Sequence, residues 1–266
     1  MKTVAELMRC DGRVAMIVGG AGYIGATAAQ VCAELGASVA VVDVDGPRAK
    51  AVAAALTMRN EAKSVGLVAD LSSEPATRGA VRAVVEQFGR LDILIHSAAF
   101  VGTTAFPGWA VPFAEQSSAA FEAASRVNLT SAFVLAQEAA PHLAAGCGSI
   151  VLVSSIYGTV GPNAALYVGT SMQNPLGYGV SKAGLQQLAR SLATTLGPDV
   201  RVNTVSPGGV LRSQPASFVD RYTERTPLGR MATEEDLKGA FAYLASDLSA
   251  YVTGHDLVVD GGWTAW

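Results

Sequence analysis

Short apolar, β-branched runs alternate along the chain with longer alanine-rich stretches, and this alternation restricts the fold more than any other feature of the sequence. Each run is a few residues long and almost continuously hydrophobic, as in parallel strands that are buried on both faces. Parallel strands need long crossover connections, which are usually helices. The predicted strands are Val14–Val18, Val39–Val42, Ser64–Ala69, Leu91–Ile95, Ile150–Val153, Val200–Val205 and Leu257–Val259.

Helix-like segments lie between these runs, near residues 23–35, 47–59, 74–88, 117–142, 178–197 and 233–246. The pattern predicts an α/β fold, a single-domain Rossmann-like doubly wound sheet of about seven mainly parallel strands flanked by helices. Right-handed crossovers place helices on both faces of such a sheet. No linker divides the chain, so we expect residues 1–266 to form one domain.

One region departs from the alternation. Residues 156–177 are rich in Gly, Asn, Ser and Pro, carry no charge, and are about twice as long as an ordinary strand-to-helix connection. The uncharged stretch extends from 139 to 181, which favours a position deep in the protein or along a cleft. We predict that 156–177 and the segment after Pro207 form a pocket for a polar, mostly uncharged substrate. The alternative is that 156–177 packs at a subunit interface.

Composition excludes several classes of protein. Half of the 266 residues are apolar and 15% are charged, the opposite of a disordered chain. Lys and Arg number 19 against 22 Asp and Glu, so no basic surplus exists to bind nucleic acid. The uncharged stretches 14–33 and 93–114 are interrupted by glycines, prolines or polar side chains, so we expect no membrane span.

Cysteine and histidine usage gives no sign of a metal or disulfide framework. The three cysteines are odd in number and lack C-x-x-C spacing. His96, His142 and His255 share no spacing, and no carboxylate cluster accompanies them, so we predict no metal site. The first residues have no apolar signal-peptide core. We therefore expect a cytoplasmic protein.

A glycine-rich turn follows the first predicted strand. Gly19, Gly22 and Gly25 have G-x-x-G-x-x-G spacing, with Tyr23 and Ile24 between the last two. A tight turn, close approach of a pyrophosphate and close helix–strand packing all exclude a Cβ atom. The following helix N-terminus presents free N–H groups to phosphates. We predict that this turn binds the diphosphate of a dinucleotide.

Two aspartates end the next two predicted strands. Asp43 lies 24 residues after Gly19, where a carboxylate accepts both hydroxyls of the adenosine ribose and repels the 2′-phosphate of NADP, so we predict NAD. Asp70, followed by Leu71, is placed to bind the adenine amino group. Each has an alternative: Asp43 as a helix N-cap in the turn 43–45, and Asp70 as the cap of the helix at 74. Arg48 lies near enough in sequence to weaken the discrimination against NADP.

A tyrosine and a lysine four residues apart, Tyr178 and Lys182, share one helical face. A phenol titrates near pH 10, and a nearby ammonium lowers its pKa towards the range of a useful base. The alternative is a plain surface pair. Ser154 and Ser155 end a predicted strand, where a hydroxyl can face a cleft. Asn128 lies within a predicted helix, where its amide is suited either to a proton relay or to an ordinary buried hydrogen bond.

Together these motifs resemble those of the short-chain dehydrogenase/reductase family over almost the whole chain. The resemblance implies a catalytic tetrad of Asn128, Ser155, Tyr178 and Lys182. Ser155 is preferred to Ser154 because the family serine is the second of its pair. Tyr167 does not fit the pattern, because serine occupies position 171.

The N-x-V-x-P-G segment that begins at Asn203 is similar to the family segment that faces the nicotinamide. The C-terminal segment is similar to the family's last strand and dimer-forming end. This implies a homo-oligomer, a dimer or a homotetramer. We expect Trp263 and Trp266 to pack at an interface rather than to form part of a ligand site. The predicted cofactor contacts are Gly19, Gly22, Tyr23, Ile24, Gly25, Asp43, Asp70, Leu71, Ala98, Tyr178, Lys182, Pro207, Gly208 and Val210.

Three features differ from the family's short branch. Tyr23 replaces the middle glycine, which gives the spacing of the extended branch, although 266 residues leave no room for that branch's additional domain. His96-Ser97-Ala98-Ala99 replaces the usual N-A-G segment. The gap from Ser155 to Tyr178 is long, and with the ending Asp-Gly-Gly-Trp-Thr-Ala-Trp it resembles a subgroup associated with surface-sugar biosynthesis clusters.

The resemblance implies an NAD(H)-dependent oxidoreductase that interconverts a secondary alcohol and a ketone on a small sugar- or polyol-like substrate. Tyr178 would transfer the proton, and Lys182 would lower the pKa of the Tyr178 hydroxyl and hold the ribose. Ser155 would orient the substrate oxygen, and Asn128 would support a water relay. Two alternatives remain: a sugar-nucleotide epimerase or dehydratase with tightly bound NAD, and a non-catalytic NAD-binding regulator. Consumption of free NAD⁺ distinguishes the three.

Overall fold

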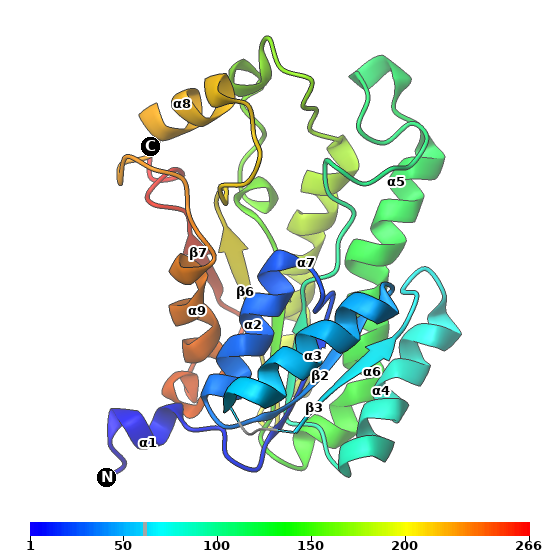
Figure 1. The fold of residues 1–266 in the computed structure, drawn as a ribbon, viewed down its shortest axis with the longest axis vertical. Coiled ribbons are helices and arrows are strands. Elements are labelled where there is room, and N and C mark those ends of the chain that lie inside the picture. Colours follow the sequence, from blue (N-terminus) through cyan, green and yellow to red (C-terminus); the bar gives the residue numbers. More distant parts are fainter. Residues whose placement is uncertain (61–62) are drawn as a thin grey trace.

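The computed structural model describes residues 1–60 and 63–266 and contains a twisted sheet enclosed by helices (Figure 1). The seven strands have the order β3-β2-β1-β4-β5-β6-β7, and every pairing among them is parallel. The predicted Rossmann-like doubly wound fold is therefore confirmed. The strands are β1 (Val14–Val18), β2 (Ser38–Asp43), β3 (Ser64–Val68), β4 (Ile93–His96), β5 (Ser149–Val153), β6 (Arg201–Pro207) and β7 (Asp256–Val259).

Helices cover both faces of the sheet. One hydrophobic cluster joins the sheet to α2, α3 and α9, and a second joins the opposite face to α4, α6 and α7. The α-helices are α1 (Val4–Met8), α2 (Tyr23–Glu34), α3 (Gly46–Asn60), α4 (Glu74–Phe88), α5 (Ser118–Ser125), α6 (Ser131–Ala144), α7 (Leu176–Leu196), α8 (Ala216–Glu224) and α9 (Glu235–Ala245).

Strand β1 shows why the apolar runs are continuous rather than alternating. Ala15 and Ile17 belong to the cluster under α2 and α3, whereas Val14, Met16 and Val18 belong to the cluster on the other face. All five side chains are buried. Burial of a Val, Ile or Met side chain stabilises a fold by roughly 1.5–3 kcal/mol, so a polar residue at any of these positions would be costly.

Three helical features differ from the prediction. The predicted helix 117–142 is divided into α5 and α6 by a π-helical turn, Arg126–Thr130. Helices α1 and α8 were not predicted, because five and nine residues carry too little periodicity for detection. The local signal for α1 was the capping box formed by Thr3 and Glu6.

The loop 156–177 contains two 3₁₀ turns, Ile156–Gly158 and Ala164–Tyr167. It packs against α8 and the C-terminal segment in a third hydrophobic cluster. We call this the aromatic cluster; its buried members are Ile156, Leu166, Phe218, Tyr222, Met231 and Trp263. The loop is thus held by side chains from distant parts of the sequence.

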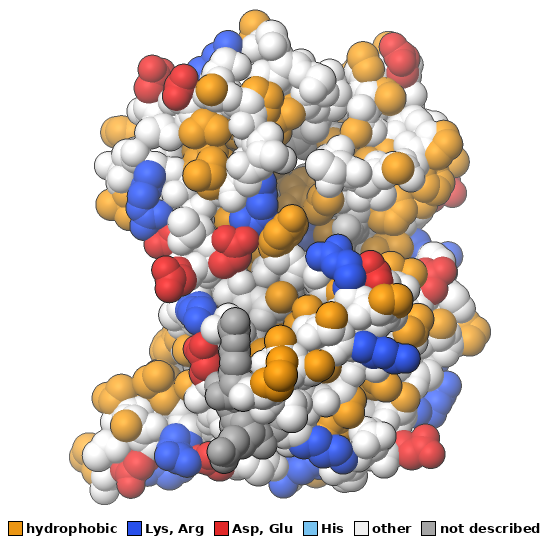
Figure 2. Space-filling view, viewed as in Figure 1, with side chains coloured by type: hydrophobic (Ala, Val, Ile, Leu, Met, Phe, Trp, Pro, Cys, Tyr) orange, Lys and Arg blue, Asp and Glu red, His pale blue; other side chains and the backbone are white. Residues whose placement is uncertain are grey.

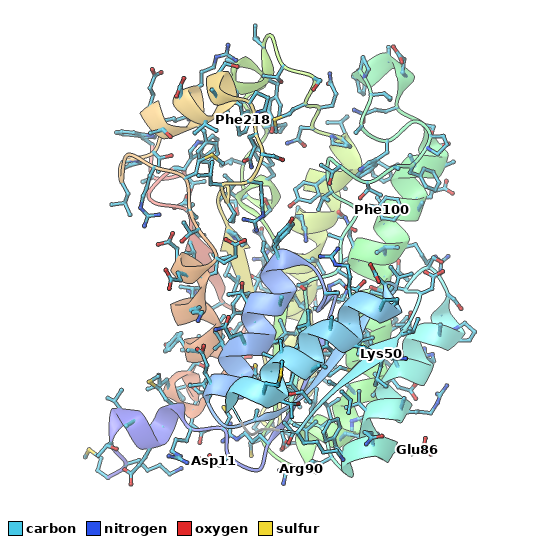
Figure 3. All side chains as sticks on the ribbon, viewed as in Figure 1. Asp11, Lys50, Glu86, Arg90, Phe100 and Phe218 are labelled. Atoms are coloured by element: carbon cyan, nitrogen blue, oxygen red, sulfur yellow. The ribbon has the colours of Figure 1, made fainter. Side chains whose placement is uncertain are left out.

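The carboxyl ends of the parallel strands all lie at one edge of the sheet, the upper edge in Figure 1. Figure 3 shows Phe100, which follows β4, and Phe218 of α8 at this end, with Asp11, Glu86 and Arg90 at the other. Ligands of doubly wound sheets bind beyond the carboxyl ends of the strands, so we expect the ligand site at the upper end. Within the described residues, no helix is both long enough and apolar enough to cross a bilayer.

Candidate active site

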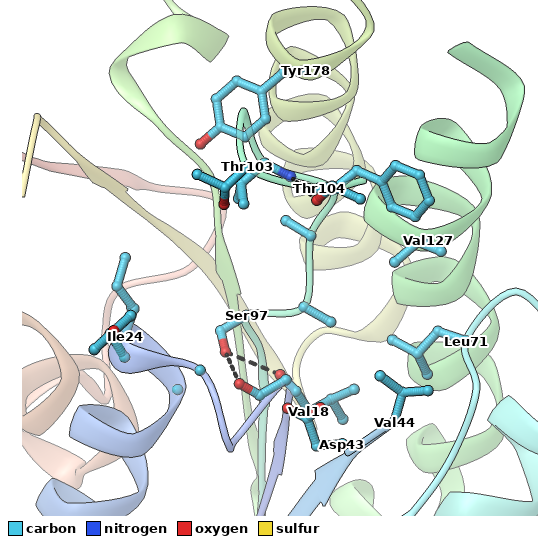
Figure 4. A pocket seen from close by; sticks show the side chains of 18 of the residues that line it. Val18, Ile24, Asp43, Val44, Leu71, Ser97, Thr103, Thr104, Val127 and Tyr178 are labelled. Atoms are coloured by element: carbon cyan, nitrogen blue, oxygen red, sulfur yellow. Dashed lines mark hydrogen bonds between the residues drawn. The ribbon is translucent and has the colours of Figure 1, made fainter. Parts of the chain in front are cut away.

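A cavity of about 1100 Å³ lies at the carboxyl edge of the sheet, where the surface is hollowed above α2 and α3 (Figures 2 and 4). Asn128 and Lys182 are buried and do not line it. All the other predicted site residues do: Gly19, Gly22, Tyr23, Ile24, Gly25, Asp43, Asp70, Leu71, Ala98, Ser155, Tyr178, Pro207, Gly208 and Val210.

The three glycines of the β1–α2 turn have different reasons to be glycine. Gly19 has φ +73°, and a Cβ atom there would collide with the backbone of Ala98. A Cβ atom at Gly25 would collide with the carbonyl of Gly19. At Gly22 φ is −73°, and a Cβ atom would lie 3.3 Å from the Gly19 carbonyl, its nearest neighbour. Packing therefore requires Gly19 and Gly25 far more than it requires Gly22.

Gly22 is the N-cap of α2 and lines the cavity, so its missing side chain leaves the helix N-terminus open to a ligand. The N–H groups at a helix N-terminus and the helix dipole attract phosphate. The turn thus fits the diphosphate of a dinucleotide: two glycines form the tight turn and the third keeps the approach clear.

Asp43 lies at the end of β2, beside this turn. Its carboxylate accepts hydrogen bonds from the Ala21 N–H (3.0 Å) and the Asp45 N–H (3.1 Å). The cap of α3 is instead Asp45, which accepts from the Arg48 N–H at 3.1 Å. The Arg48 guanidinium donates to the Ala21 carbonyl at 2.8 Å, so a cation also lies on the Gly-rich turn.

Asp70 and Leu71 line the cavity after β3. Asp70 accepts a hydrogen bond from the Ser72 N–H at 2.9 Å. Helix α4 is capped by Ser73, whose hydroxyl accepts from the Ala76 N–H, so the alternative role of Asp70 as helix cap is wrong.

Tyr178 and Lys182 project from the first turns of α7 towards the end of β5. The Tyr178 side chain reaches into the cavity (Figure 4). Lys182 is 2% exposed, its Nζ donates to the Val153 carbonyl at 2.7 Å, and it lies 5.6 Å from the Tyr178 ring centroid. The two residues are therefore not a surface pair.

The two serines after β5 have separate partners. Ser154 donates to the Lys182 carbonyl at 2.8 Å, which anchors α7 to β5. Ser155 accepts from the Tyr157 N–H at 3.2 Å and lines the cavity beside Tyr178. Its place next to the phenol supports the choice of Ser155 as the substrate-facing serine.

Burial governs the protonation of this pair. It raises the pKa of the Tyr178 hydroxyl above its ordinary value, and the neighbouring Ser155 hydroxyl offsets only part of the rise. Burial lowers the pKa of Lys182 to about 7. The expectation that Lys182 brings down the phenol pKa is therefore not met in this structure, because burial of Tyr178 itself dominates the pKa of its hydroxyl. The ammonium of Lys182 is also desolvated and loses part of its charge near neutral pH.

Asn128 lies in the π-helical turn and is fully buried. Its Oδ1 accepts from the Phe100 N–H at 2.6 Å, and its Nδ2 donates to the Ser181 hydroxyl at 2.9 Å. The side chain thus ties the segment after β4 to α7, as the buried-hydrogen-bond alternative expected. Its part in a proton relay stays a prediction.

The predicted pocket is half right. The segment after Pro207 lines the cavity with Gly208, Val210, Arg212, Ser213 and Gln214. No residue of 156–177 is among the described residues that line it. Polar side chains of this loop form hydrogen bonds within the loop. The Tyr167 hydroxyl shares a 3.0 Å hydrogen bond with the Tyr157 hydroxyl and accepts one from Asn174 Nδ2 at 3.1 Å.

The segment after β4 forms the other wall of the cavity, and it was not predicted from the sequence. Its lining residues are Ala99, Phe100, Val101, Thr103, Thr104 and Phe106. Phe100 packs edge-on against the buried Trp109, whose indole N–H donates to the Val101 carbonyl at 2.8 Å. The available signal was the lack of charge over 93–114, at the end of a central strand.

The two C-terminal tryptophans lie in different surroundings. Trp263 is 3% exposed and stacks on Tyr222 of the same chain at 5.8 Å, so the prediction that it packs at a subunit interface is wrong. Trp266 is exposed. Among the described residues, no three His, Cys, Asp or Glu side chains gather in a metal-binding group.

The comparisons with known proteins agree with this geometry. A family profile described as enoyl-(acyl carrier protein) reductase matches residues 19–264. The chain is 35% identical to cis-4-hydroxycyclohexanecarboxylate dehydrogenase of Sinomonas cyclohexanicum, over 95% of this chain and 97% of the relative. It is 33% identical to D-threitol dehydrogenase of Mycolicibacterium smegmatis (strain ATCC 700084 / mc(2)155), over 96% and 94%.

Among solved structures, the 7α-hydroxysteroid dehydrogenase complexed with NADH and 7-oxo glycochenodeoxycholic acid superposes with a TM-score of 0.86, at 27% identity over 98% of both chains. A parallel sheet with a dinucleotide-binding turn and a buried Tyr–Lys pair defines a nicotinamide-dependent oxidoreductase. The chain belongs to the short-chain dehydrogenase/reductase family.

Proposed function

We propose that the protein is an NAD(H)-dependent dehydrogenase that interconverts a secondary alcohol and a ketone on a small, polar, hydroxylated molecule of the sugar or polyol kind. The observation that carries the proposal is the Tyr178 side chain in the cavity, with Ser155 beside it and Lys182 behind it. Relatives named for a hydroxylated ring acid and for a polyol support the substrate class.

A nicotinamide bound in the cavity would supply or accept the hydride. The chain's own groups move the proton. In reduction the Tyr178 hydroxyl gives its proton to the carbonyl oxygen and is reprotonated from solvent at the cavity. In oxidation the Tyr178 hydroxyl first loses its own proton to solvent, and the phenolate oxygen then takes the proton of the substrate hydroxyl. Ser155 donates a hydrogen bond to the same substrate oxygen and orients it. Lys182, buried behind Tyr178 and bonded to the Val153 carbonyl, would hold the nicotinamide ribose when the dinucleotide binds. Asn128 holds α7 in place.

The test is a screen of polyols, sugars and cyclic alcohols with the purified protein, followed by NADH absorbance. We expect one NADH formed for each alcohol oxidised. Isomerised or dehydrated product without net NADH would favour the epimerase or dehydratase alternative. Binding of NAD⁺ with no turnover across the screen would favour the regulator.

The preference for NAD over NADP forms part of this proposal, because the Asp43 carboxylate lines the cavity beside the Gly-rich turn. Asp43→Asn removes the charge that repels a 2′-phosphate, and we expect it to shift the ratio of kcat/KM values for NAD and NADP towards NADP by about tenfold. Equal values for the two cofactors in the unmodified protein would contradict the role of Asp43.

The proposal also takes residues 1–266 as one domain that works in the cytoplasm as a homo-oligomer, a dimer or a tetramer. Exposed aromatic side chains support association, because large apolar residues on a surface mark contact sites. Three of them lie just before or along α5 and α6: Phe113, Phe121 and Phe133. Sedimentation at several protein concentrations tests the oligomer, and a monomer throughout would exclude it.

A further inference from the structure

Arg212 is the one Lys or Arg among the described residues that line the cavity. The other charged lining residues are Asp43 and Asp70. Arg212 follows β6, in the segment that faces the Gly-rich turn across the cavity. Nothing in the proposed chemistry at Tyr178 uses this guanidinium.

The guanidinium of Arg212 lies over the ring of Tyr23, with its carbon 4.3 Å from the ring centroid. Tyr23 is the first residue of α2, directly after the N-cap Gly22, and it is 64% exposed. A cation and an aromatic face at this distance attract one another. The contact therefore joins the segment after β6 to the N-terminus of α2 across the cavity.

A second set of contacts fixes one edge of the guanidinium. Arg212 Nη1 lies 2.7 Å from Glu234 Oε1 and donates to the Leu211 carbonyl at 2.8 Å. The Arg212 N–H donates to the side chain of Gln214 at 2.5 Å, which fixes the backbone. Within residues 1–60 and 63–266, Nε and Nη2 of Arg212 donate no hydrogen bond. The opposite edge of a positioned guanidinium is thus free.

We propose that the free edge of Arg212 binds the diphosphate of the dinucleotide, and that Tyr23 and Glu234 position it for this. The inference rests on the proposed function, because it requires a bound dinucleotide. The N-terminus of α2 and the guanidinium are both positive and flank the same space. Two parallel N–H groups on one edge of a guanidinium match two oxygens of a phosphate.

The diphosphate is favoured over a substrate anion by the place of this pair in the cavity. Tyr23 and Ile24 begin α2, and Figure 4 shows Ile24 on a different wall from Tyr178. Asp43 and Arg48 lie on the other side of the same turn, where we expect the adenosine ribose. Both form hydrogen bonds with the backbone of Ala21. Through its contact with Tyr23, the Arg212 guanidinium lies next to the N-terminus of α2, which Gly22 caps.

The test compares ligands that share or lack the proposed contact. Binding of NADH, ADP-ribose and adenosine to the purified, substrate-free protein is measured by calorimetry. In Arg212→Gln we expect NADH and ADP-ribose to bind about 10- to 100-fold more weakly, the range of a charge-assisted hydrogen bond. Adenosine, which has no phosphate, should bind unchanged. The losses should shrink as salt is raised, because charge interactions are screened.

Arg230→Gln is the matched control, because Arg230 pairs with Asp236 on the surface and does not line the cavity. It should leave all three affinities unchanged. Tyr23→Phe keeps the ring and should bind NADH as the unmodified protein does, whereas Tyr23→Ala should lose part of the Arg212 effect. Arg212→Lys, which keeps the charge but not the fork, should fall between Arg212→Gln and the unmodified protein.

Three outcomes would overturn the inference. Loss of NADH affinity without loss of ADP-ribose affinity would assign Arg212 to the nicotinamide. Unchanged affinity for both, with a higher KM for the substrate, would assign it to a substrate anion. An equal loss for adenosine would indicate a structural role only. Failure of the unmodified protein to bind NADH at all would instead remove the proposed function itself.

Discussion

The turn between β1 and α2 and the loop between β5 and α7 both start at the carboxyl edge of the sheet, yet they are held in opposite ways. Backbone contacts fix the turn: Gly19 and Gly25 leave no room for a Cβ atom, and Asp43 bonds to the Ala21 N–H. Side chains from distant segments hold the loop 156–177, which packs on the aromatic cluster. A turn with so little free space should tolerate few substitutions, whereas a surface loop held by its larger side chains should tolerate many.

We expect the largest effect on activity from a substitution at Tyr178, the proposed acid–base residue directly after the loop 156–177. Tyr178→Phe removes one hydroxyl from the cavity and leaves the Gly-rich turn untouched. We expect kcat to fall by about 10²–10⁴-fold, the usual contribution of an acid–base group, with NADH affinity nearly unchanged. Steady-state rates and calorimetry measure the two quantities. A variant with half the original activity would refute the role of Tyr178.

Three glycine substitutions sharpen the contrast between turn and loop. Gly19→Ala places a Cβ atom against Ala98 at a positive φ, and we expect a loss of roughly 1–3 kcal/mol or more in the free energy of unfolding. Gly161→Ala, in the loop, meets nothing within 4 Å and should be neutral.

Gly22→Ala should lower stability only slightly, because the nearest atom to its Cβ is 3.3 Å away, and it should weaken NADH binding instead. Denaturant unfolding and calorimetry distinguish the cases. Equal losses of stability at positions 19, 22 and 161 would show that the turn is not specially constrained.

The buried lysine between the two regions should make stability depend on pH. The folded pKa of Lys182 is about 7, below its value in the unfolded chain, so above pH 7 the unfolded state binds a proton that the folded state lacks. The free energy of unfolding should therefore rise with pH from about 7 to about 10, by up to about 1.4 kcal/mol per pH unit.

Below pH 7 both states are protonated and this slope should vanish. Lys182→Met removes the group, so the difference in unfolding free energy between the two proteins isolates its contribution from those of other titrating residues. A pH-independent difference between pH 7 and 10 would contradict the low pKa of Lys182.

The smallest effects separate the two candidate walls of the cavity. Thr103→Ala or Gln214→Ala removes a polar group that lines the cavity, and each should raise the substrate KM by roughly 2- to 10-fold, the range of one hydrogen bond. The double change Gln173→Ala and Asn174→Ala lies in the loop and should leave KM within about twofold. A higher KM for the loop variant alone would restore 156–177 as the substrate wall.

The sheet and its helices were predictable because buried parallel strands produce continuous apolar runs, and the β1–α2 turn was predictable because its glycines are required by local geometry. The division between α5 and α6 was not predictable. In a π-helical turn the hydrogen bonds span five residues instead of the four of an α-helix, and this difference leaves no clear pattern in the sequence. The packing of Trp263 on Tyr222 was also hidden, since the two lie in separate segments that only the folded chain brings together.

The pKa of Tyr178 shows a different limit. Its spacing from Lys182 correctly placed both side chains on one helical face, but burial of the tyrosine raises the pKa of its hydroxyl, and burial of the lysine lowers the pKa of the ammonium. Spacing defines which groups are neighbours, whereas their desolvation depends on every element packed around them.

The position of Trp109 gives the protein an optical reporter of its own ligands. Its indole is buried and packs against Phe100, which lines the cavity, whereas Trp266 is exposed to solvent. The excitation energy of Trp109 would transfer to a reduced nicotinamide bound in the cavity. Such transfer is efficient only at short separation, and one side chain, Phe100, lies between the indole and the cavity. Quenching of tryptophan fluorescence, with Trp263→Phe and Trp266→Phe to leave Trp109 as the emitter, would then follow occupancy of the cavity in real time without any label.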